Sequence, residues 1–359
     1  MIKRIVRTLA STALIALITL LLAEVVLRAT MTMAWKSPLY VADPDIGFRV
    51  RPAASTDTTS VNALGFNDVD HSANKAEGVT RLALVGDSFV FGVVPRPKGV
   101  AAVVQRLADD AGEHLEVLNM GIPGAGPKNY LRLIGKDVVD ERADVVGVVV
   151  FLGNDVVQAH PDFDARIWLG DVREVLVNPF QIGWSTEYLA VFRMARATAR
   201  VLRERSKAAG DSTFSKESFV EIEAQRAVVF ETTPSGFVRD SYSSLIEIVR
   251  QMQATAHAHG VKLFVVLAPD QIQVEDTVRA EVFRAEGLNS SGYDFEGLPR
   301  RLGQELEASG IPTLNLLPVF RGSQQTASLY LKQDSHWNEA GNALAGEAIR
   351  EFMHARDLR

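Results

Sequence analysis

The 359-residue chain contains no cysteine. Disulfide frameworks, cysteine-based zinc sites and thiol nucleophiles are therefore excluded, although this absence does not fix the compartment in which the protein works. A surplus of positive charge is also missing, since 38 Lys and Arg stand against 44 Asp and Glu. Without a basic stripe interleaved with aromatics, no nucleic-acid partner is expected. No H-E-x-x-H or clustered His and carboxylate spacing predicts a metal, and no cofactor is implied.

The N-terminus carries one long apolar run, from Leu9 to Leu27, which only Glu24 interrupts and which three cations precede. A membrane-spanning helix needs about 20 apolar residues and the core of a signal peptide roughly 7 to 15, so the run lies between the two cases. Small residues are poorly placed for cleavage, and the cations fit the positive-inside rule. We expect residues 1–30 to be an uncleaved membrane anchor, rather than a cleaved signal peptide or a buried helix, with everything after Arg28 exported.

Turn-forming pairs dominate residues 31–78, among them Ser37-Pro38, Asp43-Pro44 and Arg51-Pro52. Such pairs favour turns and short strands over helices. We interpret this segment as a stalk with short strands that Phe48 and Phe66 dock onto the main body, and we place the main domain at residues 79–359.

The first motif follows an apolar β-type run, Leu82 to Val85, that breaks at Gly86 and continues into Asp87 and Ser88. This places a hydroxyl at the carboxyl end of a strand, the edge where open parallel α/β sheets bind ligands. A helix starting there would direct its free N–H groups and its positive dipole end toward Ser88. Ser88 is thus a candidate nucleophile, the alternative being that Asp87 or Ser88 only caps the helix.

A glycine-rich turn, NMGIPGAG from Asn119 to Gly126, follows a second predicted strand at Leu115–Leu118. Its glycine order and Pro123 do not match a dinucleotide fingerprint. A glycine-rich turn can also present backbone N–H groups to a ligand, because no side chains obstruct the approach. Gly124 is the candidate donor.

The third predicted strand, Val145–Leu152, is a continuous apolar run typical of a central parallel strand, and Gly153, Asn154 and Asp155 follow it. An Asn at this place is commonly a turn former. Its amide can also donate to a developing oxyanion at the same sheet edge as Ser88.

Two further strands, Lys262–Leu267 and Pro312–Leu316, alternate with helical segments and complete a five-stranded parallel α/β sheet. Residues 160–240 break this rhythm and form an insertion after the third strand. The insertion is either a source of substrate selectivity or a packing elaboration. Its arginines between Arg193 and Arg205 form either a solvated helix face or a surface for an anionic glycan or lipid.

The last motif is DSHWN, Asp334 to Asn338, directly before an amphipathic helix. An acid two residues before His336 can orient the imidazole, which titrates near neutrality and can therefore take and return a proton. Ser88 would attack an ester carbonyl, and His336 would be its base. The Ser88 N–H, the Gly124 N–H and the Asn154 side chain would bind the oxyanion.

In this order, GDSF, NMGIPG, GND and DSHWN resemble the SGNH (GDSL-type) hydrolase superfamily over roughly Arg81 to Met353, apart from the insertion. The resemblance implies a flavodoxin-like three-layer α/β/α fold. It also implies a nucleophile at Ser88, oxyanion donors at Gly124 and Asn154, and an acid and base at Asp334 and His336.

Two features depart from the common family pattern: the acid stands two rather than three residues before His336, and Trp337 replaces the usual proline. This D-x-H-W form looks like that of SGNH proteins of bacterial exopolysaccharide O-acetylation, such as those acting on alginate.

These observations predict an ester enzyme, anchored in the membrane with its catalytic domain at the periplasmic or extracellular face, that works through an acyl-Ser88 intermediate. An O-acetyl esterase and an O-acetyltransferase on an exported polysaccharide fit equally, and transfer would need a membrane partner that delivers the acyl donor. A non-catalytic polysaccharide-binding protein of the same fold, or a lipase or acyl-thioesterase, are the alternatives.

Overall fold

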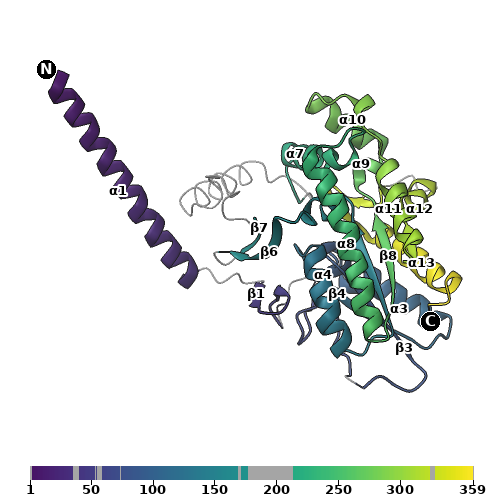
Figure 1. The fold of residues 1–359 in the computed structure, drawn as a ribbon. Helices are drawn as coiled ribbons and strands as arrows, with labels where there is room; N and C mark the ends of the chain where they lie inside the picture. Colours follow the sequence, from purple (N-terminus) through teal and green to yellow (C-terminus); the bar gives the residue numbers. More distant parts are fainter. Residues whose placement is uncertain are drawn as a thin grey trace.

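The computed structural model of the chain describes residues 2–34, 40–52, 54, 59–72, 74–168, 171–176, 213–323 and 328–358 (Figure 1). Five strands form the central sheet: β3 (Thr80–Gly86), β4 (Leu115–Gly121), β5 (Val145–Phe151), β8 (Lys262–Ala268) and β9 (Thr313–Asn315). They pair in the order β4-β3-β5-β8-β9, and every pair is parallel. This is the flavodoxin-like order, so the predicted five-stranded parallel sheet is confirmed.

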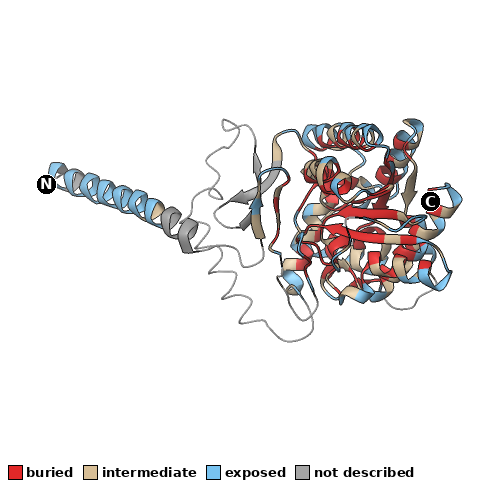
Figure 2. Cartoon of the chain, turned by 90° about the horizontal axis from the view of Figure 1, so that it is seen from below, coloured by how far each residue is buried: buried red, intermediate tan, exposed pale blue. Residues whose placement is uncertain are grey.

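Helices cover both faces of the sheet. Alternate residues of a strand point to opposite faces, and in β3 Leu82 and Leu84 pack with α3 (Val100–Asp110) and α13 (Glu339–Ala355). Ala83 and Val85 pack on the other side with α4 (Pro127–Leu133), α8 (Gly236–Ala258) and α11 (Gly297–Ala308). The buried residues lie between these layers, as Figure 2 shows, and the predicted three-layer sandwich is confirmed.

Short elements connect the layers at the sheet edges. They are α2 (Ser88–Phe91), η1 (Arg96–Lys98), η2 (Ile134–Val138), α5 (Asp155–Gln158), α9 (Gln271–Val274), α10 (Asp276–Ala285), η5 (Ser290–Gly292), α12 (Leu317–Gly322), β10 (Tyr330–Leu331) and β11 (Asp334–Trp337). The last two strands form an antiparallel hairpin directly before α13.

Residues 40–72 pack against the main body through the hairpin of β1 (Tyr40–Asp43) and β2 (Gly47–Val50). Phe48 and Phe66, the residues expected to dock this segment, are both buried in the same cluster as one face of the sheet. Asn67 adds a buried hydrogen bond to the Phe91 carbonyl at 2.9 Å. The boundary at residue 78 stays a prediction.

The N-terminal helix α1 (Ile2–Ala34) contains a stretch, Arg7–Val26, that is long and apolar enough to cross a membrane and is not buried against the protein. Within the described residues it is the one such helix. A signal sequence near the N-terminus can meet the same criteria of length and hydropathy, so membrane anchoring stays a prediction.

The insertion contributes a hairpin of β6 (Phe163–Trp168) and β7 (Asp171–Leu176), then α7 (Lys216–Arg226) and η4 (Ala227–Phe230). The hairpin is a sheet of its own, separate from the central five strands. The arginine cluster from Arg193 to Arg205 lies outside the described residues.

Candidate active site

Ser88 is the first residue of α2, directly after β3 ends at Gly86. The capping role that could have explained Ser88 belongs to Asp87, whose carboxylate accepts a hydrogen bond from the Phe89 N–H at 2.9 Å. The Ser88 hydroxyl is therefore left for another partner. A helix was expected to start at this turn, and α2 is a single turn of four residues, so its dipole is weaker than that of a long helix.

His336 contacts both Ser88 and Asp334. Its Nε2 lies 2.7 Å from Ser88 Oγ, and its Nδ1 lies 2.5 Å from Asp334 Oδ1. The His336 backbone N–H also donates to Asp334 Oδ1 at 3.1 Å. A carboxylate on Nδ1 favours the tautomer that carries its proton there, which leaves Nε2 free to accept the Ser88 proton. Residues 248 positions apart in the sequence thus form one hydrogen-bonded chain.

Trp337 anchors the loop that carries His336. Its side chain is buried and packs edge-on against Phe89, with ring centroids 4.9 Å apart, and against Phe320 at 5.4 Å. The His336 ring lies 5.2 Å from the same Phe89 ring. The tryptophan at the usual proline position therefore fixes β11 to the core beneath α2, as aromatic packing of this kind can do.

The two carboxyl groups next to His336 and Ser88, those of Asp334 and Asp87, have different surroundings. Burial opposes ionisation of Asp334, but hydrogen bonds from His336 and Thr213 outweigh it, so its pKa lies below the usual value. Asp87, behind Ser88, is completely buried, and this burial raises its pKa although Phe89, His336 and Asn154 favour its charged form. Asp334 is thus held as the carboxylate that faces His336.

The two loop residues expected to bind an oxyanion are placed differently. Asn154 follows β5, and its Nδ2 donates to Asp87 Oδ2 at 3.3 Å, which brings its amide next to the residue before Ser88. Gly124 lies exposed in the turn after β4 with a φ of 78°. Among the described residues, Gly124 makes no hydrogen bond to Ser88, Asn154 or His336.

Several polar residues around the site were not anticipated from the sequence. Thr213, Glu223 and Arg226 come from the insertion, where no pattern singled them out, and Thr213 helps to lower the pKa of Asp334. Asp270 follows β8 at the sheet edge that carries Ser88 and Asn154. An acid directly after the fourth strand was the one sequence signal that could have identified it.

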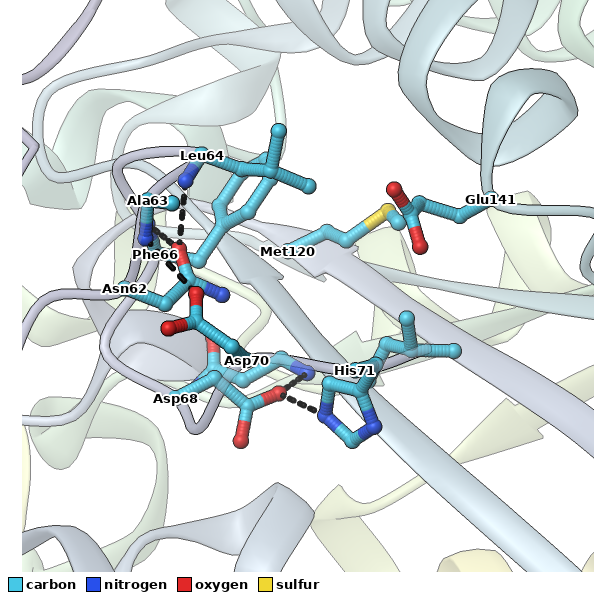
Figure 3. A pocket seen from close by; sticks show the side chains of 11 residues that line it. Asn62, Ala63, Leu64, Phe66, Asp68, Asp70, His71, Met120 and Glu141 are labelled. Carbon is cyan, nitrogen blue, oxygen red and sulfur yellow. Dashed lines mark hydrogen bonds and ion pairs between the residues drawn. The ribbon is translucent and has the colours of Figure 1, made fainter. Parts of the chain in front are cut away.

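A cavity of about 300 Å³ lies against β4, away from Ser88, His336 and Asp334. It is lined by the segment from Asn62 to His71, together with Met120 and Glu141 (Figure 3). None of Ser88, Asp334 and His336 lines it. In the part of the chain that the structure describes, no group of three or more His, Asp or Glu is arranged to hold a metal ion.

Comparison with known proteins gives one family match: residues 233–358 match the model of the SGNH hydrolase-like domain of the acetyltransferase AlgX. This range includes Asp334 and His336 but not Ser88, Gly124 or Asn154. No curated protein matches the chain.

Solved structures with a similar fold include three esterases or acylhydrolases. The lipase/acylhydrolase from Enterococcus faecalis has 15% identity, covers 77% of this chain and 97% of its own, and has a TM-score of 0.41. The acetyl xylan esterase AlAXEase has 12% identity, 76% and 98% coverage, and a TM-score of 0.43. A catalytic mutant of the acetylxylan esterase Axe2 from Geobacillus stearothermophilus has 15% identity, 78% and 96% coverage, and a TM-score of 0.40.

The family match, the strand order and the four motifs agree. The chain therefore resembles the SGNH hydrolase superfamily and, over its C-terminal third, the AlgX-type domain.

Proposed function

We propose that the protein is an SGNH-type serine ester enzyme that acts through an acyl-Ser88 intermediate. The observation that carries the proposal is the hydrogen-bonded chain from Ser88 Oγ through His336 to Asp334. A hydroxyl is a weak nucleophile at its ordinary pKa, and an adjacent base oriented by an acid is what activates it. The AlgX-type match supports the broader class of esterase or acyltransferase.

In the first half-reaction, Ser88 Oγ attacks the ester carbonyl carbon while His336 Nε2 takes the hydroxyl proton. The carbonyl oxygen becomes an oxyanion, for which the Ser88 N–H, the Gly124 N–H and the Asn154 amide are the proposed donors. When the tetrahedral intermediate collapses, His336 returns the proton to the leaving alcohol, and the acyl group stays on Ser88.

In the second half-reaction, an acceptor hydroxyl loses its proton to His336 as it attacks the acyl-Ser88. When this intermediate collapses, the bond from the acyl carbon to Ser88 Oγ breaks, the acyl group leaves on the acceptor, and His336 returns the proton to Ser88 Oγ. Asp334 stabilises the imidazolium that forms twice in the cycle, and its lowered pKa keeps it charged near neutral pH. If the acceptor is water the enzyme is an esterase, and if it is a sugar hydroxyl the enzyme is a transferase.

The acyl group is proposed to be acetyl and the carbohydrate an exported polysaccharide. The match to an acetyltransferase domain supports this choice. The apolar helix α1 supports a membrane-anchored protein whose catalytic domain is exported, as the positive-inside rule would orient it. For transfer, a membrane partner is proposed to deliver the acyl donor.

Mass spectrometry after brief exposure to a p-nitrophenyl ester or an organophosphonate tests the proposal. Ser88 should be labelled, the label should vanish in Ser88→Ala, and it should weaken strongly in His336→Ala. Folded protein without any label on Ser88 would contradict the proposed enzymatic activity and favour a non-catalytic polysaccharide-binding protein.

Assays on acetylated and deacetylated glycans, with and without a donor ester, then distinguish water from a sugar hydroxyl as the acceptor. Release of acetate without transfer at any acceptor concentration would exclude a transferase activity. A preference for long acyl chains over acetate in a chain-length series would instead indicate a lipase or thioesterase.

A further inference from the structure

Helix α7 buries an acid beneath the loop that carries His336. The Glu223 side chain has no exposed surface. Its Oε1 accepts hydrogen bonds from Ser335 Oγ at 2.5 Å and from Arg226 Nη1 at 2.9 Å. Arg226 also hydrogen-bonds to Ser335 Oγ. Because Ser335 stands between Asp334 and His336, α7 is tied directly to the loop of the candidate base.

A second buried acid faces Glu223 from another element. Asp270, after β8, caps α9 by accepting from the Ile272 N–H at 3.1 Å, and its Oδ2 lies 3.9 Å from Arg226 Nη1. Arg226 Nη1 thus lies close to both carboxylates, and Glu223 Oε2 and Asp270 Oδ2 are buried with no hydrogen-bond partner among the described residues. Two ionised carboxylates beside a single cation would leave one negative charge unpaired, and a proton on one of them removes that charge.

Asp270 also packs against the turn that carries Asn154. A Cβ placed on Gly153 would lie 2.3 Å from Asp270 Oδ2, closer than atoms can approach without a shift. The residue before Asn154 is therefore held against the same acid pair. The pair therefore contacts the loop that carries His336 through Ser335, and the turn that carries Asn154 through Gly153.

We propose that Glu223 and Asp270 form a proton-sharing carboxyl pair that positions the His336 loop and the Asn154 turn. Both are positioning residues, since neither contacts Ser88 or His336 directly. The inference rests on the proposed function and adds a structural role for the insertion, which supplies Glu223 and Arg226.

The charges of the cluster give the pair a pH dependence. Burial and the nearby Asp270 raise the pKa of Glu223 well above its usual value, against the opposing effect of Arg226. Below that pKa, the charges of Asp270 and Arg226 balance around a neutral Glu223. Above it, a second negative charge appears beside Asp270, in a side chain that is fully buried. Unpaired buried charge is costly, so the two loops should shift and activity should fall as the pH rises.

The experiment measures the rate of organophosphonate labelling of Ser88 in the full chain, in detergent, from about pH 6 to about pH 10. Glu223→Gln keeps the size and the neutral state, so its rate near pH 7 should stay near that of the wild type and the alkaline fall should disappear. Glu223→Ala should label about 10- to 100-fold more slowly, because small displacements of a catalytic group have effects of that size. Glu221→Gln, an exposed glutamate on the same helix, is the matched control and should match the wild type throughout.

Hydrogen exchange at the His336 amide, which donates to Asp334, is the second measurement. It should become faster in Glu223→Ala and stay slow in Glu223→Gln and Glu221→Gln. An unchanged alkaline fall in Glu223→Gln, or unchanged exchange and labelling in a folded Glu223→Ala, would overturn the inference. If the wild type is not labelled at all, the proposed function fails, and the exchange data still decide whether the pair positions the loop.

Discussion

His71 and His336 are two of the histidines that contact carboxylates, and their surroundings differ. His71, beside the cavity against β4, lies between two acids. Its Nε2 is 3.1 Å from Asp68 (Figure 3), and its Nδ1 is 2.8 Å from Glu116. Hydrogen bonds to Asp68 and Glu116 raise the pKa of His71 to about 9, against the effect of burial. His336 has one carboxylate on Nδ1 and a neutral hydroxyl on Nε2.

This difference separates a structural histidine from a candidate base. A ring with a carboxylate on each nitrogen donates both protons and stays charged, so it can only hold its partners together. A ring with a single carboxylate keeps one nitrogen able to accept a proton from a hydroxyl. The number of acids around the ring, rather than burial, distinguishes the two.

The largest effect is expected from His336→Ala. Loss of the base should lower kcat/KM for an acetyl ester by roughly 10,000-fold, because members of such a triad act as a unit. The thermal midpoint should change little, since His336 is partly exposed. A kcat/KM within about tenfold of the wild type would contradict the assignment of His336 as the base.

Asp334→Asn comes next. The amide can present an N–H to Nδ1 and favour the wrong tautomer, and the expected loss of kcat/KM is about 100- to 10,000-fold. Acetyl ester hydrolysis by the purified variant measures it. Ser328→Ala, in the segment just before β10, is a control that leaves the Asp334 contacts intact, and equal losses in the two variants would indicate a folding defect instead.

In contrast to the variants of His336 and Asp334, His71→Ala should lower stability and leave activity unchanged. The expected result is a loss of roughly 1 to 3 kcal/mol in the free energy of unfolding, because two half-buried acids each lose a charged partner, with kcat/KM unchanged within about twofold. Urea unfolding and ester hydrolysis on one preparation measure both quantities. A large loss of activity at unchanged stability would assign His71 a role in the chemistry.

The same contact predicts a pH dependence of stability. The pKa of His71 is raised from 6.5 in the unfolded chain to about 9 in the folded protein. Its contribution is therefore fully present below pH 6.5 and is lost as the pH rises through about 9. The difference in unfolding free energy between wild type and His71→Ala should shrink over that range, and a constant difference would contradict a charged His71.

The smallest effect is expected from Asp68→Asn, which leaves His71 with one carboxylate, as His336 has. The pKa of His71 should move from about 9 toward 6.5, because the bond to Asp68 is the largest cause of the shift. An NMR titration of the ring protons, assigned with His71→Ala, measures it. A pKa that stays near 9 would show that Glu116 alone is sufficient.

The sequence predicted the elements that have a local signal. Continuous apolar runs identified β3, β5 and β8, because a strand buried on both faces needs no polar alternation. The short helices α9 and α10 were not anticipated, since α9 has only four residues and the ten residues of α10 mix apolar and charged side chains without a long apolar period.

The sequence by itself determined the parallel sheet and the residues at its carboxyl edge, because parallel strands bring their ends to one side wherever the chain repeats strand and helix. Only the tertiary structure decided which side chains meet there. The contacts of His336 with Ser88, and of Glu223 with Ser335 and Asp270, join elements far apart in the chain. Their distances depend on how α7 and the β10–β11 hairpin pack against the sheet, which no local periodicity encodes.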